Sequence, residues 1–451
     1  MPLERESAPI EARLSAFDIS MVVFSLVVGI GIFRTPALVA EAAGGTLSFY
    51  AAWLAAGLVS LIGALTFAEI GSRHPRAGGY YRVVADCYRP TLAFMLNWSQ
   101  TLMQGAGAAG VAFIGADYLT PIVLPPAWRG PHATVTIALS TMLVLLASNY
   151  LGIKPGARIQ NLLSTSKILL MVALAGFALA LAPHVPSPTP APPASGSSGL
   201  RFISALIPCF YAYGGYQLTM NLGADLKNAR RRFPLAIASG MLTVVLLYLL
   251  LNLAYQRSLG TDGVAQSKLV AAALARITFG APGEVLISIM VFLSAAGFVN
   301  ATILQMPRSF YAMAQDGVLP RAFLRVNPAT QVQEVGLLFF GLTMLVPALM
   351  LGSFEKLLRY VIFTDTLTVA VVASTLFVLR RRHSGDGGFS VPGYPLLPLF
   401  YLVCLVGIAA RVFSLEPALA IAGIAVFLTG WPLYRLGRKA FAGGRLTGRE
   451  G

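Results

Sequence analysis

The residues from Met21 to Pro36 read MVVFSLVVGIGIFRTP, an apolar helical stretch that is interrupted near its middle by Gly29 and Gly31. In the hydrocarbon core of a bilayer, a break in a helix leaves backbone N–H and C=O groups that need partners from protein, water or a ligand. The break is therefore a candidate binding site. The alternative is that the two glycines only let a neighbouring helix approach closely, as small residues commonly do between membrane helices.

The composition indicates an integral membrane protein. Of the 451 residues, 56% are hydrophobic and only 11% are charged, whereas soluble domains carry about 25% charged residues. So few charges cannot cover the surface of a soluble core of this size. The three cysteines, Cys87, Cys209 and Cys404, show neither paired nor metal-ligand spacing. We therefore expect no disulfide, no metal site and no cofactor.

Twelve apolar runs are long enough to span a bilayer, which takes about 20 residues. We therefore predict an all-α integral membrane protein with twelve transmembrane helices. The runs near residues 104 and 297 are longer than one bilayer thickness, so we expect these two helices to be tilted. The predicted spans are centred near residues 29, 58, 104, 141, 170, 212, 245, 297, 342, 368, 402 and 424.

Basic residues are concentrated on one side of the predicted spans. The chain has 33 lysine and arginine residues and 18 acidic residues, and most of the basic ones fall in the connections that share a side with the N-terminus. The positive-inside rule then predicts that both termini are cytoplasmic, in a multi-pass protein of the plasma membrane. The net charge of +15 reflects this topology, so we expect the lipid bilayer and no nucleic acid as a partner.

Two outer segments interrupt the series of spans. The first, PHVPSPTPAPPASGSSG, has too little apolar content to fold against the bundle and is expected to be an external flexible linker. The second has apolar residues at helical spacing near residues 262–280 and predicts an interfacial helix. The predicted organisation is a cytoplasmic segment at 1–17, a five-helix repeat at 18–182, the linker at 183–200, a second five-helix repeat at 201–382, helices 11 and 12 at 383–436, and a cytoplasmic tail at 437–451.

A second interrupted helix opens the second half. The sixth span reads FISALIPCFYAYGGYQLTMNLGADL, with Gly214 and Gly215 near its centre. Interrupted helices at corresponding positions of two halves are the best sequence indication of a transporter's binding site. The N-terminus of a half-helix presents unpaired N–H groups that suit a carboxylate, and its C-terminus presents carbonyls that suit an ammonium. We therefore expect the two breaks to bind the zwitterionic backbone of an amino acid.

Four motifs, in the same order along the chain, resemble one family. They extend over at least the first 320 residues, and they are similar to motifs of the amino acid–polyamine–organocation superfamily, above all its bacterial amino acid permeases and light-chain-like exchangers. The resemblance implies a LeuT-like fold, in which two inverted five-helix repeats begin with broken helices 1 and 6 and two further helices follow. It also implies a secondary transporter that works by alternating access. The motifs are VVGIGIFRTP, FAEIGSRHPRAGGYYRV, FYAYGGYQ with ADLKNARRRFPLAI, and RSFYAMAQDGVLP.

The resemblance also implies the binding residues. Backbone groups at the first break would face the substrate carboxylate, carbonyls at the second break would face its amine, and Tyr211 would be the aromatic gate. Ile30 stands where many exchangers have serine, which removes a hydroxyl contact, while Asp225 and Ala229 replace a glutamate and a proline of the loop motif. No residue is assigned a catalytic role. Gln104 is added because it shares a helical face with Gln100, a pattern that polar packing between helices explains equally well. The candidate substrate-binding residues are Val28, Gly29, Ile30, Gly31, Ile32, Gln104, Phe210, Tyr211, Ala212, Tyr213 and Gly214.

Lys167 lies within the fifth span, nine residues beyond Arg158, which is about 14 Å of helix. Ionisable residues at such depth usually face the protein interior and serve function. The resemblance adds that sodium-independent members place a lysine on the fifth helix where sodium-coupled relatives hold a cation. We therefore assign Lys167 to coupling and predict sodium-independent transport, by exchange or with protons. Asp365 lies at mid-membrane in the tenth span and is assigned no role.

Three rival functions fit the sequence less well. A channel needs rings of polar residues along a water-lined path, whereas these spans are nearly free of charge. An intramembrane enzyme has no obvious acid–base groups, because the four histidines lie in connections or at span edges. A polyamine or other organic amine would favour acidic residues near the breaks, and neither broken segment has one near its centre. We therefore predict a transporter of neutral L-amino acids and no enzyme; the sequence leaves the preferred amino acid, the transport mode and the oligomeric state open.

Overall fold

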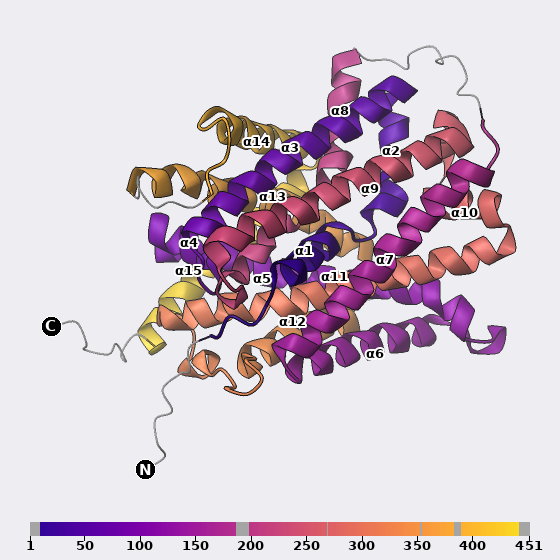
Figure 1. The fold of residues 1–451 in the computed structure, drawn as a ribbon. Helices are drawn as coiled ribbons and strands as arrows, with labels where there is room; N and C mark the ends of the chain where they lie inside the picture. The colour runs from indigo at the N-terminus through magenta and orange to yellow at the C-terminus, as the bar shows by residue number, and fades with distance from the viewer. Residues whose placement is uncertain (1–9, 186–197, 268, 352–353, 383–388, 442–451) are drawn as a thin grey trace.

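A computed structural model describes residues 10–185, 198–267, 269–351, 354–382 and 389–441. These parts of the chain form a helical bundle (Figure 1). Short 3₁₀ helices occur at Pro126–Trp128, Tyr216–Asn221, Gly223–Asp225 and Arg321–Leu324. The α-helices are α1 (Ala16–Val27), α2 (Gly31–Ala43), α3 (Thr46–Arg73), α4 (Gly79–Cys87), α5 (Pro90–Val123), α6 (Pro131–Tyr150), α7 (Ile153–Leu181), α8 (Ser198–Ala212), α9 (Ala229–Gln266), α10 (Val270–Phe279), α11 (Ala281–Gln315), α12 (Glu334–Leu351), α13 (Phe354–Arg382), α14 (Leu396–Leu415) and α15 (Pro417–Phe441).

Eight helices in the described part of the chain are long and apolar enough to cross a membrane, and a ninth span results if the bent pair α1 and α2 is counted as one. The eight are α3, α5, α6, α7, α9, α11, α14 and α15. Helices α8, α12 and α13 cover three more of the predicted span centres but are not among the eight. Helices α5 and α11, with 34 and 35 residues, are each about 50 Å long, well beyond a hydrocarbon core of about 30 Å.

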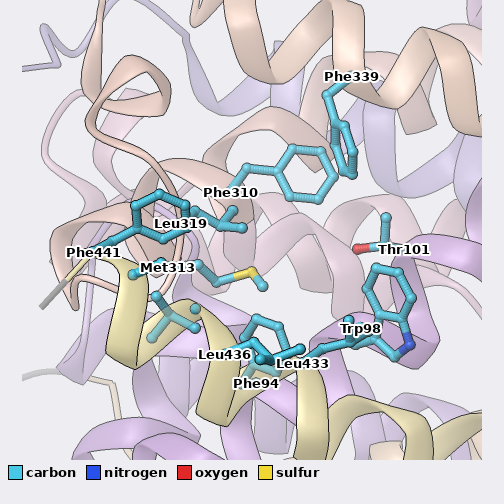
Figure 2. Close-up of a pocket in the computed structure, with 13 residues that line it drawn as sticks. Phe94, Trp98, Thr101, Phe310, Met313, Leu319, Phe339, Leu433, Leu436 and Phe441 are labelled. Carbon is cyan, nitrogen blue, oxygen red and sulfur yellow. The ribbon is translucent and has the colours of Figure 1, made fainter.

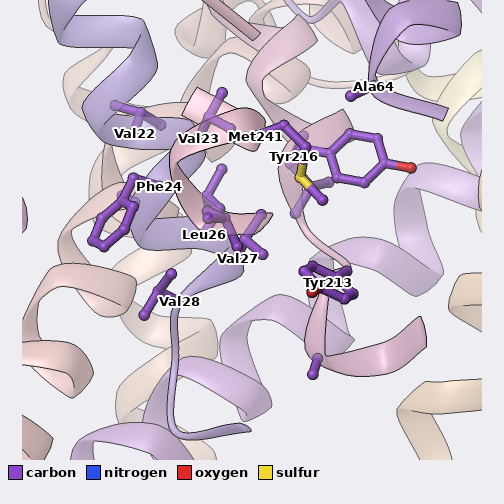
Figure 3. Packing of buried hydrophobic residues seen from close by; sticks show 14 of the residues in the cluster. Val22, Val23, Phe24, Leu26, Val27, Val28, Ala64, Tyr213, Tyr216 and Met241 are labelled. Carbon is purple, nitrogen blue, oxygen red and sulfur yellow. The ribbon is translucent and has the colours of Figure 1, made fainter. Parts of the chain in front are cut away.

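Helix α1 is enclosed by the rest of the bundle. Every residue from Ile19 to Val27 is buried, and α1 contacts α9, α7 and α11 (Figure 1). Figure 3 shows Val23 of α1 near Met241 of α9 and Tyr216 of the second break, with Phe24 on the opposite side of α1. A helix that is apolar on all sides can be covered by protein or by lipid, and here protein covers α1, so the broken helix lies in the interior of the bundle.

The outer helices present apolar side chains to the surroundings. Leu169 of α7, Leu246 of α9 and Val403 of α14 are all more than half exposed. Water would disfavour so much exposed apolar surface, whereas lipid tails would not. The helices and their surfaces therefore define a multi-pass membrane protein.

Several predicted segments are covered only in part. Residues 186–197 of the linker, 1–9 and 442–451 at the ends, and 383–388 before helix 11 lie outside the described residues. Where an interfacial helix is expected, α9 continues to Gln266 with a kink at Gly260, and the separate helix is α10 (Val270–Phe279). Helix α15 runs to Phe441, four residues past the predicted start of the tail at 437.

Candidate functional site

The first break separates α1 from α2, whose axes differ in direction by 47°. The amide of Gly29 donates to the carbonyl of Val27 at 2.9 Å, which ends α1 in a tight turn. Gly29, Ile30 and Gly31 are partly accessible, although Val28 and Ile32 on either side are buried. The first N–H groups of a helix have no partner within that helix, so the accessible end of α2 suits an anionic group.

The glycines of the first break are not required by close approach of another helix. A methyl group added to Gly29 would have Phe298 Cδ2 as its nearest neighbour, at 4.0 Å. One added to Gly31 would meet the backbone of Ala212 at 3.7 Å, an ordinary van der Waals distance. Either methyl group would fit at ordinary contact distances, so the packing of helices does not require glycine at these two positions.

The second break has a different form from the one predicted. Helix α8 ends at Ala212, and the chain continues after Gly215 as a 3₁₀ helix, not as a second α-helical half. The amide of Gly215 donates to Oε1 of Gln217 at 3.0 Å, so this N–H group is already satisfied by the protein. The expected amide site for a carboxylate is therefore at the first break, and the second break contributes the C-terminal end of α8.

The two breaks are in direct contact with each other. Gly215 has φ of +117° and lies so close to the carbonyl of Leu26 that an added Cβ would collide with it. The hydroxyl of Tyr248, from α9, lies 3.1 Å from the carbonyl oxygen of Ala212 and 3.3 Å from that of Val27. It therefore links the C-terminal ends of α1 and α8. The sequence does not single out Tyr248, because it stands in a leucine-rich run with no local motif.

Lys167 is fully buried beside the first break. Its ammonium Nζ donates to the carbonyl of Val28 at 2.5 Å and lies 5.0 Å from the centre of the Phe24 ring. One turn away, the hydroxyls of Ser25 and Ser164 are 2.7 Å apart. The side chain thus supplies a donor to a carbonyl that the break leaves without a helical partner.

The predicted residues at the second break divide into two groups. Phe210, Tyr211 and Gly214 line a cavity of about 30 Å³. Tyr213 is fully buried on another side, with its ring centre 5.8 Å from Trp53, and it does not line this cavity. Ala212 is buried, and Gln104, on α5, is partly accessible, but neither is among the residues that line it.

An acidic residue also lines this cavity, although neither broken segment has one near its centre. Asp365 of α13 is partly accessible there, and its Oδ1 accepts a hydrogen bond from Nε2 of Gln100 at 2.7 Å. The sequence places Asp365 at mid-membrane but does not show that α13 brings it next to a break that lies some 150 residues earlier in the chain.

A larger cavity of about 340 Å³ lies between α5, α11, α12 and α15 (Figure 2). Figure 2 shows that its walls are mainly aromatic and aliphatic, with Phe94, Phe310, Met313 and Leu433 among them. Burying a zwitterion among such groups without hydrogen bonds is unfavourable. None of the predicted site residues lines this cavity, so its size does not make it the substrate site.

The loop motifs meet in space. Arg308, from RSFYAMAQDGVLP, makes two hydrogen bonds of 3.0 and 3.1 Å to the carboxylate of Asp225, from ADLKN. Arg82, from the GGYYRV motif, contacts Asp316 at 2.6 Å. Segments that are far apart in sequence are thus joined by ion pairs, which gives these motifs a structural role outside the pocket.

The fold and site define a multi-pass helical membrane transporter, with a broken central helix whose accessible backbone faces a second break. A family model described as amino acid permease matches residues 14–431. The chain therefore belongs to the amino acid permease family, as its motifs indicate, and it is a transporter and not an enzyme.

Individual relatives are distant but match over most of their length. The serine/threonine exchanger SteT of Bacillus subtilis (strain 168) is 26% identical over 417 residues, which cover 91% of this chain and 93% of SteT. The human cystine/glutamate transporter is 25% identical over 96% of this chain and 87% of its own. The mouse large neutral amino acids transporter small subunit 2 is 26% identical over 91% of this chain and 78% of its own.

Proposed function

We propose that this permease carries neutral L-amino acids across the plasma membrane by alternating access, without sodium. The observation that carries the proposal is the accessible backbone at residues 29–31, directly after the buried residues 19–28. The free N–H groups at the start of α2 suit the substrate carboxylate without any charged side chain. The names of the relatives, which include a serine/threonine exchanger and a large neutral amino acids transporter, support this class of cargo.

The substrate ammonium would lie at the C-terminal end of α8. Carbonyl groups at a helix C-terminus favour a cation. The carbonyl of Ala212 accepts a hydrogen bond from the hydroxyl of Tyr248. Ala212 would therefore contribute less to binding of the substrate ammonium than the resemblance implies. Tyr211, which is half-buried, would close over the bound substrate.

Lys167 supports independence from sodium. Its ammonium holds the Val28 carbonyl beside the break, and a fixed cation there would repel a bound sodium ion. We further propose twelve transmembrane helices in two inverted five-helix repeats plus two, with both termini cytoplasmic. In support, each predicted span centre falls in a helix or, for the first, in the break between α1 and α2.

The test is uptake of a radiolabelled amino acid panel by liposomes that contain the purified protein. We expect uptake of neutral L-amino acids that is unchanged when external sodium is replaced by choline. Preloading the liposomes with unlabelled amino acid, or imposing a proton gradient, would identify exchange or proton coupling. Absence of amino acid uptake under every gradient would contradict the proposed cargo, and sodium-stimulated uptake would contradict the role of Lys167.

A further inference from the structure

The cavity beside the second break has an acidic end that the proposed function does not use. Asp365 reaches it from α13, opposite Gly214 and Tyr211 of the broken segment. The residue as a whole is partly accessible, and its carboxylate accepts a hydrogen bond from a neutral amide, that of Gln100. Among the described residues that line this cavity, none is basic.

The groups around Asp365 are aromatic rings and neutral polar side chains. The carbonyl oxygen of Gln100 has no hydrogen-bond partner in the described part of the chain. Tyr211, Tyr216 and Tyr401 line the same cavity, and the hydroxyls of the last two are 2.8 Å apart. A carboxylate surrounded by aromatic rings is the environment that recognises amines, because the rings attract a cation and the carboxylate accepts its N–H bonds.

We propose that the Asp365 cavity is a subsite for a primary ammonium group at the end of a substrate side chain, so that the permease also accepts basic amino acids such as lysine and ornithine. This inference rests on the proposed function, because the backbone of such a substrate would be held at the two breaks. A carboxylate on the side chain would be repelled by Asp365. A volume of about 30 Å³ suits a compact ammonium, which is close to a water molecule in size.

The same ammonium chemistry is offered by a free diamine. Three compounds of matched length separate the cases. Lysine has both the backbone zwitterion and the terminal ammonium, norleucine lacks only the terminal ammonium, and cadaverine lacks only the carboxylate. Each would be tested for inhibition of uptake of the neutral amino acid that the liposome panel identifies as best.

We expect lysine to inhibit uptake about tenfold more strongly than norleucine, because a hydrogen bond to a charged group typically strengthens binding by about this factor. Cadaverine should inhibit weakly. In Asp365→Asn the ratio of lysine to norleucine inhibition should fall about tenfold. Asp117→Asn is the matched control: it removes the same charge from an exposed position on α5 that does not line the cavity, and its ratio should stay at the wild-type value.

The remaining outcomes separate the subsite from the proposed cargo. If norleucine inhibits but lysine is no better, or if Asp365→Asn leaves the ratio unchanged, the ammonium subsite is wrong and neutral transport stands. Equal inhibition by cadaverine and lysine would show that the ammonium binds without the backbone zwitterion, which would contradict a subsite for the side chain of an amino acid and indicate a site for free diamines. Because both inhibitors are measured on the same preparation, a poorly folded variant lowers both signals and leaves the ratio readable.

Discussion

The two breaks contain paired glycines for different physical reasons. A methyl group added to Gly29 or Gly31 would meet nothing closer than 3.7 Å, an ordinary contact distance, and both residues are partly accessible. At Gly215 the backbone is left-handed and an added Cβ would collide with the Leu26 carbonyl. The first break is thus open toward a ligand, whereas the second is fixed against α1. A glycine in a membrane helix can serve either purpose, and only the surroundings distinguish them.

The largest loss of stability is expected at the second break. Gly215→Ala forces a left-handed alanine against the backbone of α1, which should cost about 2 kcal/mol or more. We expect a much lower yield of folded protein and a lower melting temperature in detergent. Gly214→Ala is the neighbouring control, because its added methyl would meet Tyr211 O at 3.4 Å and its φ is not left-handed. Equal stability of the two variants would refute the structural role of Gly215.

At the first break the largest effect is expected from Lys167→Met. The substitution removes the ammonium that holds the Val28 carbonyl, and loss of a buried charged hydrogen bond costs about 1.5 to 3 kcal/mol. Liposome uptake should fall about tenfold or more. The control is Lys154→Met, at an exposed position near the start of the same helix, which should keep wild-type uptake. Wild-type uptake by Lys167→Met would contradict its role in coupling.

A smaller effect is expected from the residue that joins the two breaks. Tyr248→Phe keeps the ring and removes the hydroxyl near Ala212 and Val27. One neutral hydrogen bond contributes about 0.5 to 1.5 kcal/mol, so uptake should fall between about twofold and tenfold. Tyr255→Phe, on the same helix, removes a buried hydroxyl with no partner among the described residues and should be close to neutral. If Tyr255→Phe lowered uptake more than Tyr248→Phe, Tyr248 would not belong to the functional site.

The smallest change in stability is expected at Gly29. Gly29→Ala places its methyl group 4.0 Å from Phe298, so the melting temperature should stay near the wild-type value, with a cost of about 0.5 kcal/mol or less. Uptake should nevertheless fall, because the methyl group enters the accessible space beside the amides of α2. A large loss of stability would mean that this glycine, like Gly215, serves close contact between helices.

Helices and the first break could be predicted from the sequence because both depend on local properties. Apolar run length places the helices, and paired glycines in an apolar run mark the breaks. The form of the second break could not be predicted, because the Gln217 side chain satisfies the Gly215 amide. The sequence also does not show that Tyr211 lines the cavity whereas Tyr213 does not. The side that each residue faces depends on the rotation of the chain at the end of α8. The contributions of Tyr248 and Asp365 arise only when α9 and α13 fold against the breaks.

The buried ammonium of Lys167 also bears on how the membrane potential acts on transport. Its ammonium is bound to the protein and remains with it through the cycle, so it does not cross the membrane with the cargo. A cycle that carries a zwitterion then moves no net charge, as long as Lys167 keeps its proton. The membrane potential, which acts with about 2.3 kcal/mol per charge and 100 mV, performs no work on such cargo. Neutral amino acids would therefore accumulate only when the downhill movement of another solute drives their transport. The transport of a cargo with a charged side chain would also respond to the membrane potential.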